Sequence, residues 1–369
     1  MKRPRPESTE SGSRKVLLVS HTSNLSGAPI SLAQLARKLP EQGYTPLYLI
    51  PREGPLEELL RSLRVSYEVM KGPFGHAGFL GIVRREKPCL VHVNSLVRTW
   101  PLFLSRLMGL PVIWHVREHL GGKRGYAKLI HALSDRVVVI SREQAMLFEG
   151  LPRAVRIPNA VDISQFRVAR TANRDRRRQT VVAYVGAIEP RKGLLTLARA
   201  FRLLKNGRQI RVMVVGGTSP ENSQYERKVK EHLRALGLEK NWQFLGARSD
   251  VPAVLAASDI LCHPAHVEAF SRVILEAMAS GLPVVSTVVG GTPEMVDHGV
   301  TGILVQPGDE RSLAEAIDTL HADRRLAERM GRAGRRKAAK IFSLELHAER
   351  VAALYDSLLA AKAARRRRL

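Results

Sequence analysis

The sequence predicts an α/β protein that folds into two doubly wound domains, each with a parallel sheet covered by helices. Three observations support this prediction. Short apolar segments bounded by turn residues alternate with segments of helical periodicity along the chain. The alternation stops over a polar, basic stretch at residues 161–180 and then restarts. The chain has 369 residues, which is enough for two ordinary domains.

The first domain is expected at residues 15–165, after a leader at residues 1–14 that we expect to be disordered. Its first strand is predicted at residues 15–20 (KVLLVS), an apolar run bounded by turn residues. A helix follows with Pro29 in its first turn, where the missing amide of proline costs nothing. Later strands are predicted at residues 46–50, 89–93, 111–116 and 136–140, with helical segments such as 96–109 and 142–150 between them. This alternation indicates a parallel sheet.

A linker is predicted at residues 166–179, and the second domain at residues 180–342. Residues 343–369 are expected to form a long helix with an apolar stripe, followed by a basic tail. The two halves share an architecture but no repeated sequence. Strands of the second domain are predicted at residues 180–186, 210–217, 242–246, 259–263, 282–287 and 302–306.

The chain carries a net charge of +25, which favours an anionic partner such as nucleic acid, a membrane surface or a phosphorylated substrate. The basic runs lack interleaved aromatic residues, and no zinc-finger or RNA-recognition motif is present, so no nucleic acid partner is expected. A basic surface without a specific partner explains the charge equally well. The basic residues lie at 174–178, 335–337 and 365–368, with further cations at Arg84, Arg85, Lys87, Lys123 and Arg124.

Cysteine usage and hydropathy favour a cytoplasmic protein. Cys89 and Cys262 lie far apart in apolar surroundings, which indicates reduced core thiols rather than a disulfide or a zinc site. The chain contains no apolar run of about 18 residues and no secretory signal at its start. No Asp-x-Asp pair is present, and therefore no metal ion is expected to bind a diphosphate here.

Two junctions between strand and helix in the second domain carry charged residues, and ligands of doubly wound sheets bind at such junctions. Arg191 and Lys192 precede Gly193 and a predicted helix, an arrangement suited to a diphosphate. Glu268 lies in a loop and Glu276 inside the next helix, where acids facing a cleft can accept hydrogen bonds from sugar hydroxyls. The alternative for Arg191 and Lys192 is a solvated turn. The alternative for Glu268 and Glu276 is a helix with one exposed glutamate at each end.

Three further features are expected at the same edges of the sheets. The backbone amides of Phe270, Ser271 and Arg272 open the two-glutamate helix and can donate to a ligand. Gly27 precedes the first helix of the first domain and lets the backbone approach an anion, although no G-x-G-x-x-G motif accompanies it. His115, near the end of a strand, is either a catalytic group or a satisfied core histidine, and the two interpretations stand level.

Taken together, these segments resemble the family-4 retaining glycosyltransferases, which have the GT-B fold. The resemblance extends from Lys15 to the vicinity of Leu359. Its most specific part is the E-x7-E pattern of Glu268 and Glu276, followed by AMASGLPVVST and GGTPEMVDHGVTGILVQPGD. The other matching segments are LSGAPISLAQLARKL, RIPNAVD and PRKG.

The resemblance implies a fold and a reaction. Two Rossmann-like domains would face a central cleft, and the last helix would return to the first domain, which binds the acceptor. The chain would move a sugar from a nucleoside-diphosphate sugar to a glycan, lipid-linked or small-molecule acceptor, with retention of anomeric configuration and without a cofactor. Such reactions belong to cell-envelope polysaccharide or glycolipid biosynthesis. The returning helix would bring the basic tail near the first-domain cations, so an anionic membrane surface is a further expected partner.

The resemblance also implies roles for individual residues. Lys192 would hold the donor diphosphate with Arg191 nearby, and Glu276 would bind the ribose of the nucleotide. Glu268 and the helix amides that follow it would face the transferred sugar. His115 would lie across the cleft near the reacting centre, so Glu268 and His115 are the expected catalytic residues.

Two positions depart from the family pattern. Ala187 stands where an arginine is frequent, and Ser271 stands where a glycine is common. Without an arginine at position 187, one positive charge that would bind the donor phosphate is missing. Arg191 or Arg272 can take its place. A sugar-nucleotide epimerase of the same fold and a nucleotide-binding relative without turnover are therefore kept as alternatives.

Overall fold

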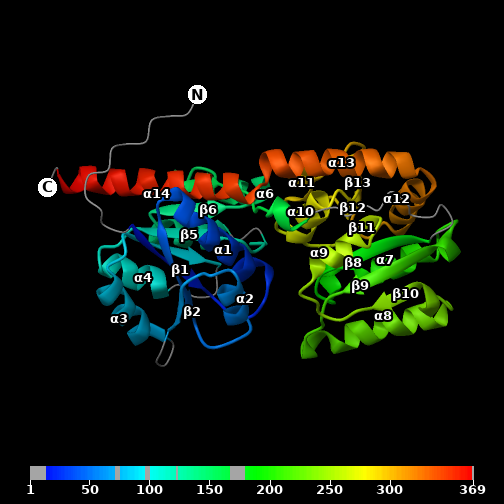
Figure 1. Ribbon diagram of the computed structural model, residues 1–369, viewed down its shortest axis with the longest axis horizontal. Coiled ribbons are helices and arrows are strands. Elements are labelled where there is room, and N and C mark those ends of the chain that lie inside the picture. Colours follow the sequence, from blue (N-terminus) through cyan, green and yellow to red (C-terminus); the bar gives the residue numbers. More distant parts are fainter. Residues whose placement is uncertain (1–13, 71–74, 96–99, 122–123, 167–178, 368–369) are drawn as a thin grey trace.

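The computed structural model describes residues 14–70, 75–95, 100–121, 124–166 and 179–367. The predicted leader and linker, and the basic run within that linker, lie almost entirely outside these residues. Two α/β units stand side by side, and the last helix runs back along the first unit (Figure 1).

The first unit is built on a parallel sheet with the strand order β3-β2-β1-β4-β5-β6-β7. Its central strands are almost wholly apolar and buried on both faces, as expected of a sheet covered by helices on each side. The strands are β1 (Lys15–Ser20), β2 (Thr45–Ile50), β3 (Tyr67–Val69), β4 (Leu90–Asn94), β5 (Val112–Val116), β6 (Arg136–Val139) and β7 (Ala154–Arg156). The helices are α1 (Gly27–Lys38), α2 (Leu56–Ser62), α3 (His76–Glu86), α4 (Trp100–Leu107), α5 (Arg124–Leu133) and α6 (Arg142–Leu147).

The second unit repeats this design with the strand order β10-β9-β8-β11-β12-β13, again parallel throughout. Its strands are β8 (Thr180–Val185), β9 (Ile210–Val215), β10 (Trp242–Phe244), β11 (Ile260–His263), β12 (Val284–Thr287) and β13 (Gly302–Val305). Its helices are α7 (Leu194–Phe201), α8 (Ser223–Ala235), α9 (Val251–Ala256), α10 (Arg272–Ala279), α11 (Thr292–Met295), α12 (Glu310–Ala322) and α13 (Arg324–Ile341), and a 3-10 turn η4 (Pro190–Lys192) precedes α7.

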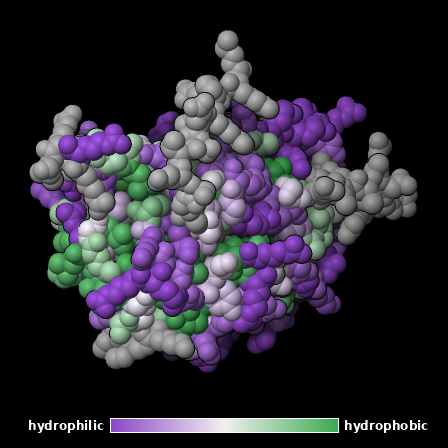
Figure 2. Space-filling model, turned by 60° about the vertical axis from the view of Figure 1, so that its left-hand side comes forward, coloured by the Kyte–Doolittle hydropathy of each residue, from purple (hydrophilic) through white to green (hydrophobic). Residues whose placement is uncertain are grey.

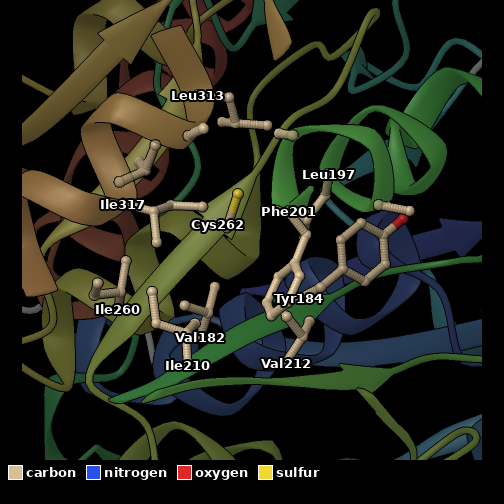
Figure 3. Packing of buried hydrophobic residues seen from close by; sticks show 14 of the residues in the cluster. Val182, Tyr184, Leu197, Phe201, Ile210, Val212, Ile260, Cys262, Leu313 and Ile317 are labelled. Atoms are coloured by element: carbon tan, nitrogen blue, oxygen red, sulfur yellow. The ribbon is translucent and has the colours of Figure 1, made fainter. Parts of the chain in front are cut away.

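One face of the second sheet packs against α7 and α12. Val182 and Val212 project from the strands toward Phe201 of α7, while Leu313 and Ile317 come from α12 (Figure 3). Apolar burial of this kind stabilises a fold by about 25 cal/mol for each Å² removed from water. This face of the sheet is therefore packed by residues of the second unit itself and supports the loops at its carboxyl edge.

Helix α14 (Leu344–Arg366) belongs to the first unit in space, although it follows the second in sequence. Ala348, Val351, Tyr355 and Leu358 lie in the same buried cluster as Leu32 and Leu35 of α1, among others. The predicted return of the C-terminal helix is confirmed, together with the two Rossmann-like domains and the cleft between them.

Two edge strands escaped prediction. β3 and β7 are three residues long, and their side chains are half-buried or exposed, so neither has the apolar run that marks the inner strands. Both cysteines are free, with Cys262 buried and Cys89 half-buried. No helix within the described part of the chain is long and apolar enough to cross a membrane.

Candidate functional site

The carboxyl edge of the second sheet carries the charged residues that the sequence singled out. After β11 the chain forms a loop that ends at Ser271, the N-cap residue of α10. The hydroxyls of Ser286 and Thr287, on β12, donate to the carbonyl oxygens of His263 and Ala265 at 2.8 and 2.5 Å. The neighbouring strand therefore holds this loop in place.

Two glycines allow other loops to approach this segment. Gly193 has a φ of +71°, and a Cβ atom there would lie 1.9 Å from the carbonyl oxygen of Pro264. Gly290 has a φ of +51°, and a Cβ atom there would lie 1.8 Å from the carbonyl oxygen of Glu268. Any side chain would push the loops apart, so both positions require glycine. The PRKG and GGTPE segments consequently pack against the Glu268 loop.

Glu268 is a nearly buried carboxylate surrounded by hydrogen-bond donors. Its Oε2 accepts from Nζ of Lys192 at 2.6 Å and from Nε2 of His263 at 3.1 Å. Its Oε1 accepts from the amide of Ala269 at 3.0 Å. Burial raises the pKa of Glu268, but the hydrogen bond from His263 and the charge of Lys192 outweigh burial and hold this pKa well below its usual range. The carboxylate is therefore ionised and fixed in position.

Glu276 forms a second charged pair, in the next turn of α10. Nη2 of Arg272 donates to Oε1 of Glu276 at 2.9 Å. Arg272 also reaches the first domain, where its Nη1 lies 3.5 Å from the carbonyl oxygen of Gly27, the first residue of α1. The structure thus brings Gly27, Arg272 and Glu276 together from opposite sides of the cleft.

Lys192 and Arg191 are neighbours in η4 but have different surroundings. The Lys192 side chain is 14% exposed and pairs with Glu268, whereas Arg191 is 51% exposed and pairs with Glu189 at 2.6 Å. The carbonyl oxygen of Arg191 accepts from the amide of His266 at 2.8 Å, which ties the turn to the Glu268 loop. Lys192 is therefore part of the Glu268 cluster, and Arg191 lies at its exposed margin.

Phe270 and Ser271 contribute backbone rather than side chains to this edge. The Phe270 ring is buried, with its centroid 5.8 Å from that of Phe342. Its carbonyl oxygen accepts from Nδ2 of Asn159, a residue of the first domain, at 3.1 Å. Ser271 is buried and makes no side-chain capping bond.

His115 does not join the Glu268 cluster. It lies inside β5, fully buried, with its Nδ1 at 3.2 Å from Nε2 of His92 and its ring stacked at 6.0 Å on that of His347. Burial, with the charge of Arg117 as a second cause, holds the pKa of His115 well below its ordinary value. The burial agrees with a core histidine, but the Nε2 atom of His115 has no hydrogen-bond partner among the described residues, so this histidine is not fully satisfied. Both interpretations of His115 therefore stand.

Four polar residues near the cleft were missed by the sequence analysis. His263 supports Glu268, while Arg117 lies at the carboxyl edge of β5, two residues after His115. Arg117 is buried and donates to Asn94 and Asn159. Arg117 could have been found from its sequence position, because it directly follows a predicted strand. The two asparagines could not be found in this way, because their contacts are with residues that are distant in sequence.

A small pocket opens at the carboxyl ends of β1 and β4 in the first domain, on the side where an acceptor is expected. Its lining is mostly apolar, from Val19, Met70, Val93, Trp100 and Pro101, with the polar residues Ser20, His21, Asn94 and Ser95 among them. Within the described residues, no group of three or more His, Cys, Asp or Glu side chains could hold a metal ion.

Comparison with known proteins supplies the family. Residues 25–165 match the family described as Glycosyltransferase Family 4, and residues 166–337 match Glycosyl transferases group 1. The D-inositol 3-phosphate glycosyltransferase of Kribbella flavida is 32% identical over 306 residues, which cover 78% of this chain and 71% of that relative. The chain therefore belongs to the glycosyltransferase family whose two halves are described as Glycosyltransferase Family 4 and Glycosyl transferases group 1.

Other relatives match about half of the chain. The D-inositol 3-phosphate glycosyltransferase of Corynebacterium glutamicum is 37% identical over 188 residues, or 49% of this chain and 44% of that relative. The capsular polysaccharide biosynthesis glycosyltransferase CapM of Staphylococcus aureus is 31% identical over 180 residues, or 48% and 46%. The chain spans about half the length of several of the curated relatives that it matches.

Solved structures support the GT-B fold of the glycosyltransferase. Anabaena Alr3699/HepE, crystallised with UDP and glucose, superposes with a TM-score of 0.82 at 24% identity, covering 93% of this chain and all of that one. Sucrose-phosphate synthase from Thermosynechococcus elongatus gives a TM-score of 0.78 at 20% identity, covering 94% of this chain. At these identities the likeness concerns the fold alone.

Proposed function

We propose that this glycosyltransferase transfers a sugar from a nucleoside-diphosphate sugar to a hydroxyl acceptor, with retention of configuration and without a metal ion. The observation that carries the proposal is the pair of charged clusters on one edge of the second sheet. Lys192 and Glu268 form one cluster, and Arg272 and Glu276 form the other, facing Gly27 across the cleft.

Each cluster provides a cation for phosphate and an acid for hydroxyl groups. Lys192 turns from Glu268 to the donor diphosphate, since an ammonium ion attracts the two phosphate charges more strongly than one carboxylate. His263 and the amide of Ala269 remain bonded to Glu268, which then accepts from the hydroxyls of the transferred sugar. Glu276 accepts from the ribose hydroxyls of the nucleotide.

The transfer itself exchanges one bond at the anomeric carbon for another. The bond from this carbon to the diphosphate oxygen breaks, and the acceptor oxygen bonds to the same face of the carbon, which retains the configuration. The acceptor proton passes to the leaving diphosphate oxygen. Lys192, Arg191 and the amides at the start of α10 stabilise the charge that develops on the leaving group.

A thermal-shift series tests the donor site. HepE was crystallised with UDP and glucose, and relatives are named for D-inositol 3-phosphate, so UDP, UDP-glucose and that acceptor are the first ligands to try. A nucleotide at a hundredfold its dissociation constant should raise the free energy of unfolding by about 2.7 kcal/mol. No shift with any nucleoside diphosphate would contradict the proposal.

Release of nucleoside diphosphate separates the remaining alternatives. A transferase releases it in proportion to the glycosylated acceptor, whereas an epimerase converts the sugar nucleotide and releases none. If this chain binds the nucleotide but releases no nucleoside diphosphate with any acceptor, it is a nucleotide-binding relative of the family that has lost turnover, with Ala187 as the suggested cause.

We also propose that the acceptor is presented at an anionic lipid surface and that the first domain docks there through α4 and α5. Phe103, Leu107 and Leu129 are 56%, 68% and 45% exposed on these helices. Neither helix contains an acidic residue. Lys362 of α14 donates to the carbonyl oxygen of Gly109, which brings the basic C-terminal end beside the same helices. The exposed residues of this α4–α5 face are Phe103, Arg106, Leu107, Arg124, Lys128 and Leu129.

The α4–α5 face combines apolar side chains that can enter a bilayer interface with cations that attract anionic headgroups. On the end of the molecule formed by the first domain, hydrophobic side chains (green) lie next to hydrophilic ones (purple) in Figure 2. Each basic residue near such a surface contributes about 1 kcal/mol, which salt screens. Arg84 and Lys87 are also exposed on this domain, whereas Arg85 is paired with Glu68 and Glu86.

Co-sedimentation with liposomes tests the surface. The protein should bind vesicles containing phosphatidylglycerol at low salt and bind phosphatidylcholine vesicles far less. Leu107→Glu should reduce the binding strongly, and removal of the residues after Lys362 should reduce it further. Val300→Glu, at a residue of the second domain that is 58% exposed, is the matched control and should leave binding unchanged. Equal sedimentation with both lipids would contradict the proposal.

A further inference from the structure

Arg117 is a buried cation whose hydrogen-bond partners among the described residues are all neutral. It follows β5 directly and is 7% exposed. Its Nε donates to Oδ1 of Asn94 at 2.7 Å, Nη1 donates to Oδ1 of Asn159, and Nη2 donates to Nδ1 of His115 at 3.3 Å. Among the described residues, no carboxylate lies within ion-pair distance of this guanidinium. Burying an unpaired cation is costly, so the arrangement points to a role in function.

The guanidinium fixes the orientation of both asparagine side chains. Arginine has only donors, so the amide oxygens of Asn94 and Asn159 must face it and their NH₂ groups must point away. Nδ2 of Asn94 donates to the carbonyl oxygen of Ala28 at 3.0 Å, and Nδ2 of Asn159 donates to that of Phe270 at 3.1 Å. One cation therefore sets the direction of two amides.

The two amides end on opposite sides of the cleft. Ala28 lies in the first turn of α1, next to Gly27, and Phe270 precedes the N-cap residue of α10. These segments meet directly as well, because Nη1 of Arg272 lies 3.5 Å from the carbonyl oxygen of Gly27. Arg117 is thus the centre of a polar brace between the two domains, formed by Asn94, Arg117 and Asn159.

The charge of Arg117 persists at neutral pH despite its surroundings. Burial, followed by the nearby charge of Arg272, lowers the pKa of Arg117 to about 9, and the charge of Glu118 opposes this shift. A pKa near 9 leaves the guanidinium protonated at neutral pH, so it continues to act only as a donor. The orientation of the two asparagines is therefore constant under physiological conditions.

We propose that Arg117 is a positioning residue for the transfer reaction. By orienting Asn94 and Asn159, it holds the acceptor-side segment at Ala28 and the donor-side segment at Phe270 in a fixed relation across the cleft. The effect on transfer rests on the proposed function, whereas the brace itself is a property of the two domains and can be measured without any reaction.

Asn159→Asp separates positioning from stability. Aspartate can pair with Arg117 and so relieves the buried charge, but it has no NH₂ group for the carbonyl oxygen of Phe270. We expect the urea midpoint to stay unchanged or rise, while kcat for UDP release from UDP-glucose with its acceptor falls at least about tenfold. The KM for UDP-glucose should change by less than about threefold, because the donor clusters are intact.

A matched control is available away from the cleft. Nδ2 of Asn241 donates to the carbonyl oxygens of Gly207 and Ile210 within the second domain. Asn241→Asp removes the same kind of bond, so it should lower the urea midpoint but keep kcat within about twofold of the wild type. If Asn159→Asp also keeps kcat within twofold, the positioning role is wrong.

Two variants of Arg117 and a distance measurement complete the test. Arg117→Lys keeps a cation and should retain more of the kcat than Arg117→Met; equal values for both would overturn the role of the charge. Spin labels at Glu53→Cys and Glu231→Cys, in a Cys89→Ala background, report the distance between the domains. This distance distribution should broaden in Asn159→Asp. An unchanged distribution refutes the brace, and a broadened one supports it even if the wild type transfers no sugar.

Discussion

The carboxyl edges of the two sheets use polar residues in different ways. At the edge of the second sheet, charges are paired on loops and on the first turns of a helix, as Lys192 is with Glu268 and Arg272 with Glu276. Such pairs lie at a partly open surface and can exchange one partner for a ligand. This edge is suited to recognising the charged donor.

The centre of the first sheet has neutral polar groups that bond mainly to one another. The hydroxyl of Tyr355 lies 2.6 Å from Nδ1 of His92, whose Nε2 in turn contacts His115, and His347 bonds to the carbonyl oxygen of Pro158 at 2.8 Å. Burial is the main reason that the pKa of His92 is lowered to about 3, and the same holds for His347. Histidines buried in the first domain thus bond to neighbouring protein groups, whereas the charged pairs of the second domain lie at the edge where we propose that the ligand binds.

Acid should therefore destabilise the buried histidine cluster of the first domain before it affects the charged pairs of the second domain. This is the largest effect that we expect. The native state keeps His92, His115 and His347 neutral, whereas the unfolded chain takes up their protons below pH 6.5. The contribution of His92 and His347 is present above pH 6.5 and is lost as the pH falls toward about 3, and His115 acts in the same direction. Each histidine should cost about 1.4 kcal/mol per pH unit in that range.

Urea unfolding at several pH values between 7.5 and 5 measures this loss. His347→Gln keeps a donor for the carbonyl oxygen of Pro158 and removes one titrating group, so the pH slope should become smaller, while the remaining buried histidines, His263 included, still contribute. The exposed His298, changed to Gln, is the control and should leave the slope unchanged. A slope that is the same in all three proteins would contradict the assignment.

Removal of Lys192 tests the exchange of partners in the second region. Lys192→Ala should weaken UDP binding by about 1.5–3 kcal/mol, the usual value for a hydrogen bond to a charged group. Uridine lacks the phosphates, so its affinity should hardly change. Calorimetry with both ligands makes the comparison, and equal losses for UDP and uridine would mean that Lys192 serves only to support Glu268.

The backbone of the second region can be tested with two glycines of similar conformation. Gly290 and Gly299 both have positive φ, but a Cβ atom would strike the carbonyl oxygen of Glu268 only at Gly290. Gly299→Ala should cost about 1 kcal/mol through backbone strain alone. Gly290→Ala should cost more and should also weaken UDP-glucose binding. Equal costs for the two variants would show that the close approach is unimportant.

Metal removal is expected to have the smallest effect. In the proposed mechanism, Lys192 and Arg191 supply the positive charge that a divalent ion provides elsewhere. Transfer measured before and after dialysis against EDTA should agree within experimental error. Activity that disappears with EDTA and returns with manganese or magnesium would contradict the metal-independent mechanism.

Much of the fold was predictable because inner parallel strands are apolar on both faces. The runs KVLLVS and TVVAYVG mark β1 and β8 without any knowledge of the partners, whereas β3 and β7 are short and partly exposed. The periodicity of the last helix indicated burial, but its place beside α1 came only from the family resemblance. Local patterns carry the elements of a fold better than its long-range contacts.

The proximity of candidate residues was predictable where they follow strands of one sheet. The contact of Glu268 with Lys192 joins two junctions that a doubly wound sheet brings to one edge. His115 was named from its place near the end of a strand, whereas its contacts with His92 and His347 come from distant parts of the chain that sequence spacing does not reveal. The contact of Arg272 with Gly27 crosses 245 positions and requires both domains to be in place.

The position of α14 has a consequence for synthesis on the ribosome. All strands of the first domain have been synthesised once the ribosome has added Arg156. The core of this domain, however, also needs Val351, Tyr355 and Leu358 of α14, which are synthesised much later. The second domain meanwhile has its own core and can fold as soon as its last helix is complete. The domains are therefore expected to fold in the reverse of the order in which they are translated. The first domain keeps an uncovered apolar face until α14 has been synthesised and packs against it.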